Sequence, residues 1–144
     1  MYLDSAYIAK CYVNEPDSPA VDKLAMGAAR LYSSVLAVAE VHCVFHRQVR
    51  GGTLKPKAAR ELARTFLEDV DEGVWELIPA SEQLLRRTAA IVIAFTPGLF
   101  LRAADAIHLT TAMELGEGEI WTSDRRMLAA APHFGLVGRS VQEP

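Results

Sequence analysis

Apolar positions recur along the chain with two different spacings, and the two spacings alternate. Short apolar runs are typical of buried strands, and they occur at residues 2–3, 31–32, 74–78, 119–122 and 136–137. Between these runs, apolar residues return every three or four positions, as they do on the buried face of a helix. This spacing predicts helices near residues 7–11, 16–29, 35–49, 56–72, 81–95, 102–115 and 124–131.

Breaking and capping residues agree with these boundaries. Gly51-Gly52 follows the third predicted helix and Pro97-Gly98 follows the fifth, while Ser33 and Ser34 offer N-cap oxygens for the helix at 35–49. Strands that alternate with helices are typical of an α/β fold with a mostly parallel sheet, here of about four to five strands flanked by helices. We see no repeat, low-complexity tract or linker, so we expect a single domain over residues 1–144.

Composition and charge narrow the class of protein. The chain has 144 residues, of which 51% are hydrophobic and 23% charged, as in an ordinary globular domain. No apolar stretch approaches the roughly 20 residues of a membrane span. The opening Met1-Tyr2-Leu3-Asp4 places an acid where a signal peptide needs basic residues. We therefore expect a cytoplasmic protein that does not contact a membrane.

Basic residues are concentrated in one segment of a chain whose formal net charge is −3. The overall charge argues weakly against a broad nucleic-acid-binding surface. The segment from 47 to 64 nevertheless holds one acid, Glu61, and six basic residues: Arg47, Arg50, Lys55, Lys57, Arg60 and Arg64. This run is interpreted either as a solvated helical hairpin that meets an acidic partner or as a surface that follows phosphates.

Cysteine and histidine do not suggest a zinc site. Cys11 and Cys43 lie in apolar contexts without Cys-x-x-Cys spacing, which predicts buried, reduced thiols. The four histidines do not cluster with them in sequence.

Four acids are expected to meet at one edge of the sheet. Asp4 ends the first predicted strand, and Asp124 follows the strand that contains Ile120 and Trp121. Glu40 lies in the second turn of the helix after the second strand, and Asp105 is near the start of the helix before the fourth strand. In a parallel sheet, strand C-termini and helix N-termini share the edge where ligands bind.

Repulsion between the carboxylates of such a cluster indicates that the site binds a cation. Each acid alone could serve a helix dipole or a salt bridge, but two carboxylates about 5 Å apart repel by about 3 kcal/mol at an effective dielectric constant near 20. A hard divalent cation neutralises such a site, and carboxylate oxygens favour Mg²⁺ or Mn²⁺ over zinc. One or two such ions can lower the pKa of a bound water and stabilise the charge of an in-line phosphoryl displacement.

The acids fall within motifs that resemble those of PIN-domain proteins. Met1-Tyr2-Leu3-Asp4-Ser5-Ala6 is similar to the opening strand and Asp-Ser motif, and Ala39-Glu40-Val41 resembles the second acidic motif. The segments 102–109 (Arg-Ala-Ala-Asp-Ala-Ile-His-Leu) and 121–128 (Trp-Thr-Ser-Asp-Arg-Arg-Met-Leu) resemble the third and fourth. Four motifs in order, over nearly the whole chain, form a specific pattern, most similar to VapC toxins of type II toxin–antitoxin systems.

The resemblance implies a three-layer PIN-like fold and an Mg²⁺- or Mn²⁺-dependent endoribonuclease. It also implies a homodimer and inhibition by a VapB-type antitoxin. Asp4, Glu40, Asp105 and Asp124 match the acidic quartet, while Ser5 and Thr122 match supporting hydroxyl positions. On this resemblance we expect the three aspartates to hold the ion directly or through water. Glu40 is expected to bind the ion's water or to act as a general base on it in the hydrolysis of an RNA phosphodiester. His108 is part of the resemblance and is interpreted as a packing or helix-bonding residue. The expected RNA or partner contacts are Arg47, Arg50, Lys55, Lys57, Arg102 and Arg125, with Arg126 beside them.

Other classes of protein fit less well. A receiver domain needs an acidic pair after the first strand and a late lysine, but no lysine follows Lys57. A dehalogenase-like phosphatase needs Asp-x-Asp, which Asp4-Ser5-Ala6 lacks. A catalytically silent PIN-like module that binds RNA or a protein stays open, as does DNA as the substrate. No residue reports the 2′-hydroxyl, so the choice of RNA depends on the resemblance alone.

Overall fold

Five parallel strands form the central sheet of the computed structural model, which describes residues 1–142. Glu143 and Pro144, the last residues of the predicted domain 1–144, lie outside the described residues. The strand order is β3-β2-β1-β4-β5. The strands are β1 (Tyr2–Leu3), β2 (Tyr32–Ser34), β3 (Glu76–Ile78), β4 (Glu119–Trp121) and β5 (Val137–Arg139). The predicted α/β class with a parallel sheet of four to five strands is confirmed.

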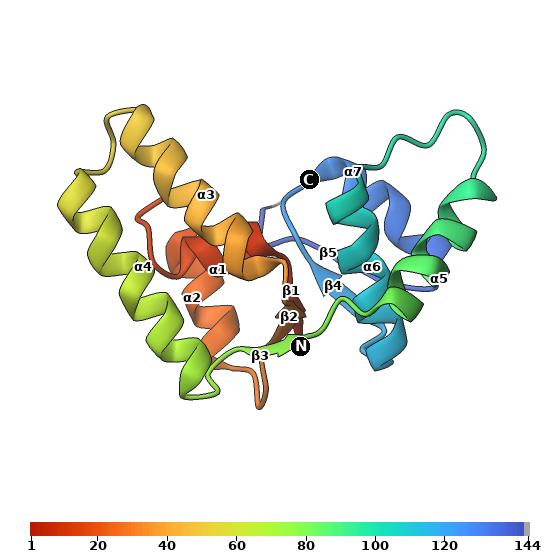
Figure 1. The fold of residues 1–144 in the computed structure, drawn as a ribbon, viewed down its shortest axis with the longest axis horizontal. Coiled ribbons are helices and arrows are strands. Elements are labelled where there is room, and N and C mark those ends of the chain that lie inside the picture. Colours follow the sequence, from red (N-terminus) through yellow and green to blue (C-terminus); the bar gives the residue numbers. More distant parts are fainter. Residues whose placement is uncertain (143–144) are drawn as a thin grey trace.

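Helices cover both faces of this sheet (Figure 1). Their bounds are α1 (Ser5–Lys10), α2 (Ser18–Met26), α3 (Ala37–Arg50), α4 (Pro56–Asp71), α5 (Glu82–Ile93), α6 (Ala103–Leu115) and α7 (Arg125–Ala130), with a 3₁₀ turn at Ala131–Phe134. Helices α1 to α4 pack on one face, and α5, α6 and α7 lie on the other (Figure 1). All seven predicted helices are present, with ends that differ by up to three residues. Among the described residues, no helix is long and apolar enough to span a membrane.

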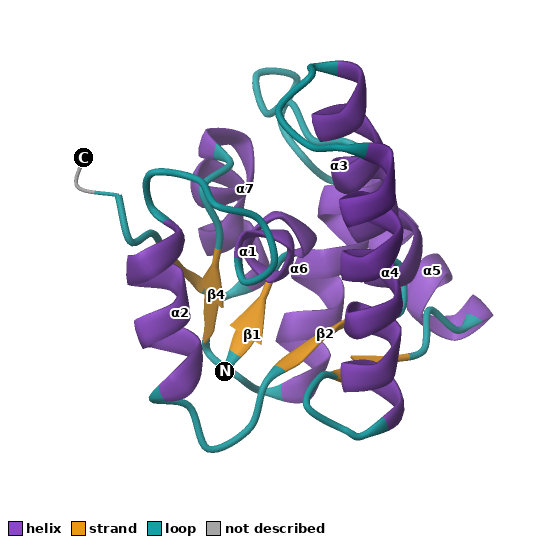
Figure 2. Ribbon diagram, turned by 90° about the vertical axis from the view of Figure 1, so that its left-hand side faces the viewer, coloured by secondary structure: helices purple, strands orange, loops and turns teal. Residues whose placement is uncertain are grey.

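Strand β1 joins the two hydrophobic cores. Successive side chains of a strand point to opposite faces, so Leu3 packs into the core under α1 to α4 and Tyr2 packs into the core under α6 and α7. Both side chains are fully buried. Figure 2 shows β1 beside β4, with both strands running toward the end of the molecule where α1 and α7 begin. The residues directly after β1 and β4 therefore meet at the carboxyl edge.

Neither serine is the N-cap residue of the third helix, although the Ser34 hydroxyl accepts from the Leu36 backbone N–H at 3.3 Å, just before the helix begins. Ser33 and Ser34 belong to β2 and are fully buried, and the Ser33 hydroxyl donates to the carbonyl oxygen of Leu3 at 2.8 Å. Pairing with β1 and β3 outweighs the local capping preference of serine because it satisfies the backbone of a buried segment. Helix α3 starts at Ala37 with Leu36 as its N-cap, so Glu40 lies in the first turn and not in the second.

An aromatic cluster fixes α3 against α1. Phe45 of α3 and Phe66 of α4 are buried, and both meet the ring of Tyr12 edge-on, with centroids 6.2 and 5.6 Å apart. The Trp75 indole donates to the Tyr12 hydroxyl at 2.7 Å. These contacts hold the helix that carries Glu40 against the segment that follows Asp4.

We predict that Gly138→Ala lowers the free energy of unfolding by about 1–3 kcal/mol, the usual effect of overpacking. A Cβ at Gly138 would lie 3.1 Å from the Leu128 Cα and 3.3 Å from its carbonyl oxygen, so β5 and α7 would have to separate. Urea denaturation measures the change. Gly98→Ala is the control, because nothing lies within 4 Å of its added Cβ. Equal stability of the two variants would contradict the prediction.

Candidate functional site

A cleft of about 340 Å³ opens at the carboxyl edge of the sheet, and all four predicted acids line it. Asp4 follows β1, Glu40 is on α3, Asp105 is on α6 and Asp124 follows β4. Residues that are 120 positions apart in sequence thus share one wall because β1 and β4 are adjacent in the sheet. The crossover topology, and not sequence proximity, assembles the site.

Asp4 is the buried centre of the cleft, with 4% of its surface exposed. One carboxylate oxygen caps α1 by accepting from the Tyr7 backbone N–H at 2.8 Å. The other oxygen accepts from the Thr122 hydroxyl at 2.5 Å. Burial raises the pKa of Asp4 above its ordinary value, although these two hydrogen bonds act in the opposite direction.

Thr122 connects Asp4 to Asp124. Its buried hydroxyl donates to Asp4 and accepts from the Asp124 backbone N–H at 2.9 Å. Asp124 in turn caps α7, since its Oδ1 accepts from the Arg126 N–H at 2.7 Å. The two acids at strand ends are therefore helix N-caps as well, and each keeps a fixed side-chain direction for that reason.

Glu40 is held by donors from two other helices. The Ser5 hydroxyl donates to Glu40 Oε2 at 2.5 Å, and His108 Nε2 lies 2.8 Å from the same oxygen. Burial alone would raise the pKa of Glu40, but the hydrogen bond and charge of His108, together with the Ser5 bond, lower it below its ordinary value. Glu40 is thus an ionised acceptor whose other oxygen, Oε1, is left for the cleft.

His108 lines the cleft, so its interpretation from sequence as a packing or helix-bonding residue missed its contact with Glu40. Its ring is 2% exposed and bridges two groups, because Nε2 faces Glu40 while Nδ1 lies 2.8 Å from the Tyr2 hydroxyl. An ionised Glu40 can only accept, so Nε2 donates to it. One feature of the sequence could have indicated this role. His108 follows Asp105 by three residues, about one helical turn, so the two side chains lie on the same core-facing side of the helix.

Asp105 carries the unsatisfied group of the cleft. Among the described residues, Asp105 Oδ2 is buried and has no hydrogen-bond partner, and no other buried side-chain oxygen or nitrogen lacks one. Burial raises the pKa of Asp105, and the negative charge of Asp124 raises it further. A buried, unpartnered carboxylate oxygen near a second carboxylate is what a cation would stabilise.

The carboxylates of the cleft are of the type that binds a hard cation, but they lie too far apart for three of them to contact one ion directly. Within residues 1–142, no three His, Cys, Asp or Glu side chains are close enough to hold one metal ion. Asp4 and Glu40 each use an oxygen for protein donors, whereas Asp105 Oδ2 is unpartnered. Magnesium commonly binds through one or two carboxylates and several waters, which suits Asp105 and Asp124 with water between the ion and the other two acids.

Two of the predicted phosphate-binding residues reach the cleft. Arg47 of α3 and Arg102, the N-cap residue of α6, line it together with the acids. Arg125 lines a neighbouring pocket instead. Arg50, Lys55 and Lys57 are exposed on the α3–α4 hairpin and do not line either pocket. The prediction of two buried thiols is wrong for Cys43, which is exposed and lines the cleft, and Cys11 is partly buried.

Comparison with known proteins agrees with this architecture. The PIN domain family model matches residues 1–132, so the chain belongs to the PIN-domain family. Ribonuclease VapC46 of Mycobacterium tuberculosis (strain ATCC 25618 / H37Rv) is 35% identical over 141 residues, which cover 94% of this chain and 93% of that protein.

Solved structures show the same fold. A chain in the crystal structure of FitAcB from Neisseria gonorrhoeae superposes with a TM-score of 0.70 at 21% identity, covering 95% of this chain and 94% of that one. A chain in the structure of FitAB bound to an IR36 DNA fragment gives 0.70 at 20% identity, covering 96% and 93%. The predicted PIN-like three-layer fold is confirmed.

We predict that Asp105→Asn stabilises the metal-free protein at neutral pH. A carboxyl whose pKa is raised by folding contributes its full stabilisation below its unfolded pKa, and that contribution is lost as pH rises through the folded pKa. The gain in the variant should therefore vanish at a pH below the ordinary carboxyl range. Urea denaturation in EDTA at both pH values tests this, with the exposed Asp71→Asn as control. A variant that is less stable than wild type at neutral pH would show that Asp105 is not electrostatically strained.

Proposed function

We propose that this protein is a metal-dependent endoribonuclease and the toxin of a VapBC-type toxin–antitoxin pair. The observation that carries the proposal is the convergence of Asp4, Glu40, Asp105 and Asp124 on one cleft, with Asp105 Oδ2 buried and unpartnered. The choice of RNA is supported by the similarity to Ribonuclease VapC46 over 94% of the chain. Arg47 and Arg102 at the rim suit a substrate with negatively charged phosphates.

The four acids have two different proposed roles: the three aspartates bind the metal ion, and Glu40 accepts a proton. Asp105 and Asp124 would hold Mg²⁺ or Mn²⁺, with Asp4 reaching it through water from its buried position. Such an ion would stabilise negative charge on the phosphate and lower the pKa of an attacking water. The chain itself fixes the positions of these carboxylates through the two helix caps and the Thr122 hydroxyl.

Glu40 is the proposed general base. Ser5 and His108 occupy Oε2, so Oε1 takes the proton of the attacking water. The water oxygen forms a bond to phosphorus, the bond from phosphorus to the leaving ribose oxygen breaks, and that oxygen takes up a proton from solvent. Arg47 and Arg102 would neutralise the flanking phosphates in a single-stranded or loop segment, where the backbone can enter a small cleft.

Protein partners are proposed on the same basis. An antitoxin of the VapB type and a second copy of this chain are the expected partners. The exposed cations of the α3–α4 hairpin, including Arg50, Lys55 and Lys57, offer a surface for acidic groups of the antitoxin or for RNA. Ile93 and Phe100 are 87% and 62% exposed, and they are the apolar groups on which a protein contact near α5 could form.

Asp4→Asn is expected to abolish RNA cleavage while the protein remains folded. The amide keeps the size of the side chain but removes the negative charge at the centre of the cleft. Purified wild type and variant are compared on a pool of structured RNAs with Mg²⁺, with Mn²⁺ and with EDTA, and circular dichroism confirms the fold. Asp71→Asn, an exposed substitution on α4, should cleave like wild type. Undiminished turnover by Asp4→Asn would remove the mechanism, and no cleavage by wild type with any metal would favour a silent binding module.

His108 is expected to act as a positioning residue for Glu40. His108→Leu removes the donor to Oε2 and should lower kcat by roughly 10- to 100-fold, the usual range for a hydrogen bond to a charged group. His108→Gln keeps a donor and should recover part of the rate, with KM for RNA little changed in both. Steady-state kinetics on a short RNA and the Tm of each variant separate this effect from unfolding. Equal kcat in the Leu variant and wild type would show that Ser5 alone fixes Glu40.

A further inference from the structure

A second pocket, of about 620 Å³, lies on the other side of Asp124 from the acidic cleft. Asp124 itself has an extended backbone, with φ −77° and ψ 114°, directly before α7 begins at Arg125, so its side chain and those of its two neighbours point in different directions. Asp124 lines the acidic cleft, whereas Ser123 and Arg125 line the second pocket. A linear ligand that passes over Asp124 would therefore enter both.

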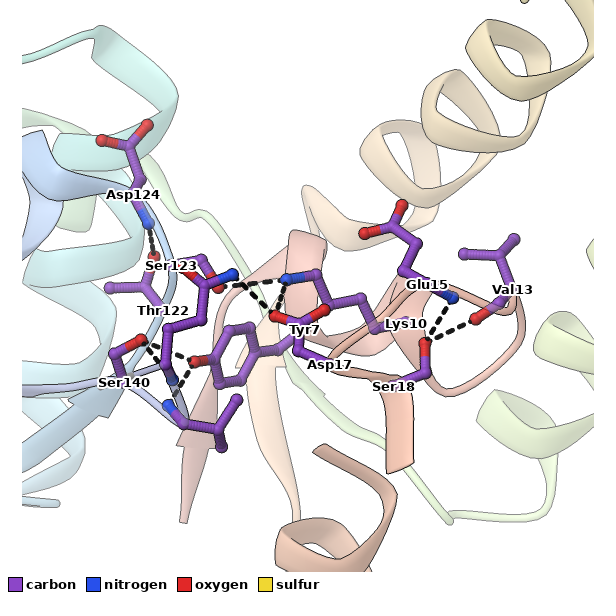
Figure 3. Close-up of polar contacts among 12 residues, drawn as sticks. Tyr7, Lys10, Val13, Glu15, Asp17, Ser18, Thr122, Ser123, Asp124 and Ser140 are labelled. Carbon is purple, nitrogen blue, oxygen red and sulfur yellow. Dashed lines mark hydrogen bonds and ion pairs between the residues drawn. The ribbon is translucent and has the colours of Figure 1, made fainter. Parts of the chain in front are cut away.

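Polar contacts from other elements hold side chains that line this pocket, among them Ser123 and Ser140 (Figure 3). Lys10 Nζ donates to the Ser123 hydroxyl at 3.1 Å, the Tyr7 hydroxyl lies 3.2 Å from the Ser140 hydroxyl, and Gln142 Nε2 donates to Asp17 Oδ2 at 2.9 Å. The Val141 backbone N–H also donates to the Tyr7 hydroxyl at 2.8 Å. Three lining side chains are thus held in place before any ligand binds.

Lys10 is the anchor of this wall. Its side chain is 9% exposed and forms an ion pair with Asp17 at 2.5 Å. Desolvating a charged pair is costly, so a buried pair is weak evidence for stability alone. Neither residue lines the acidic cleft, although the positive charge of Lys10 favours an ionised Asp4. The Lys10 amine also lies over the Tyr7 ring, 5.3 Å from its centroid, and donates to Ser123, next to Asp124. Its position at the end of α1 connects that helix to the β4–α7 turn.

The chemistry of the lining suits an anionic backbone and not a cation. Arginine, hydroxyl and amide groups line the pocket, and none of its lining residues is acidic. Glu119 holds the Arg139 guanidinium through Nε at 3.0 Å and through a terminal nitrogen at 2.8 Å, which fixes the direction of its fork. Arg125 is exposed and, within residues 1–142, lies in no ion pair.

We propose that this pocket binds the nucleotide next to the scissile phosphate of a single-stranded RNA. Arg125 contacts the neighbouring phosphodiester, while Ser123 and Ser140 face the ribose. The proposal rests on the proposed ribonuclease function and adds to it the direction in which the substrate leaves the acidic cleft, over the β4–α7 turn. Binding of this nucleotide positions the scissile phosphate in the acidic cleft. The pocket is therefore a subsite for RNA that extends beyond the two nucleotides joined by that phosphate.

The test is the affinity of the full chain for a short single-stranded RNA of mixed sequence, measured in EDTA over a range of salt concentrations. We expect Arg125→Gln to bind about tenfold more weakly, with the slope of log K against log salt reduced by about 0.7, the value for one phosphate contact on a single strand. Arg126→Gln is the matched control, because Arg126 packs over the Phe100 ring, 4.7 Å from its centroid, and does not line the pocket. A dinucleotide, which is too short to fill both pockets, should bind wild type and Arg125→Gln equally.

The outcomes separate the two proposals. Loss of affinity and slope confined to Arg125→Gln and to the longer RNA supports the subsite. Equal effects of Arg125→Gln and Arg126→Gln would overturn it, since both changes would then report only the charge of α7. If Arg125→Gln cleaves and binds RNA as well as wild type does, the subsite is overturned and the proposed ribonuclease function stands. Failure of wild type to bind or cleave any RNA would overturn both.

Discussion

The Thr122 hydroxyl, buried between the ends of β1 and β4, is the contact on which the geometry of the cleft depends. It donates to the Asp4 carboxylate and accepts from the Asp124 backbone N–H. A hydroxyl can do both at once, whereas an aliphatic side chain of the same size could do neither. One buried group therefore sets the separation of two acids that come from different strands and begin different helices.

Helix capping and the proposed cation site use the same side chains in this arrangement. Asp4 and Asp124 each satisfy a backbone N–H at a helix start, which gives them a structural role that would exist in a protein without catalytic activity. The capping oxygen fixes the carboxylate, and the second oxygen is directed by the fold. A rigid carboxylate of this kind suits a cation better than a mobile one, because no conformational entropy is lost when the ion binds.

Glu40 and Asp105 differ from the two caps because the fold leaves them in opposite electrostatic states. Glu40 has two donors, and its pKa is lowered. Asp105 has a buried oxygen without a partner, and its pKa is raised by burial and by Asp124. The two sides of the cleft therefore differ. On the α3 side, the charge of Glu40 is stabilised by two hydrogen-bond donors, and on the α6 side, Asp105 has an oxygen without a donor. The lowered pKa keeps Glu40 ionised, which the proposed general base requires, although it also makes Glu40 a weaker base. The unpartnered oxygen of Asp105 is what the proposed cation would bind.

The sequence by itself determined the class of fold, the order of the elements and the acids at the sheet edge, because hydrophobic spacing and strand-end positions are local properties of the chain. The tertiary structure decided what depends on contacts between distant segments. It placed Ser33 and Ser34 in β2, where strand pairing satisfies their backbone groups, and turned the Ser33 hydroxyl to the Leu3 carbonyl oxygen and away from the helix start. It brought His108 to Glu40 across 68 positions and Lys10 to Ser123 across 113, which no local pattern encodes. Which carboxylate oxygens stay unpartnered is likewise set by side chains that only the folded chain brings together.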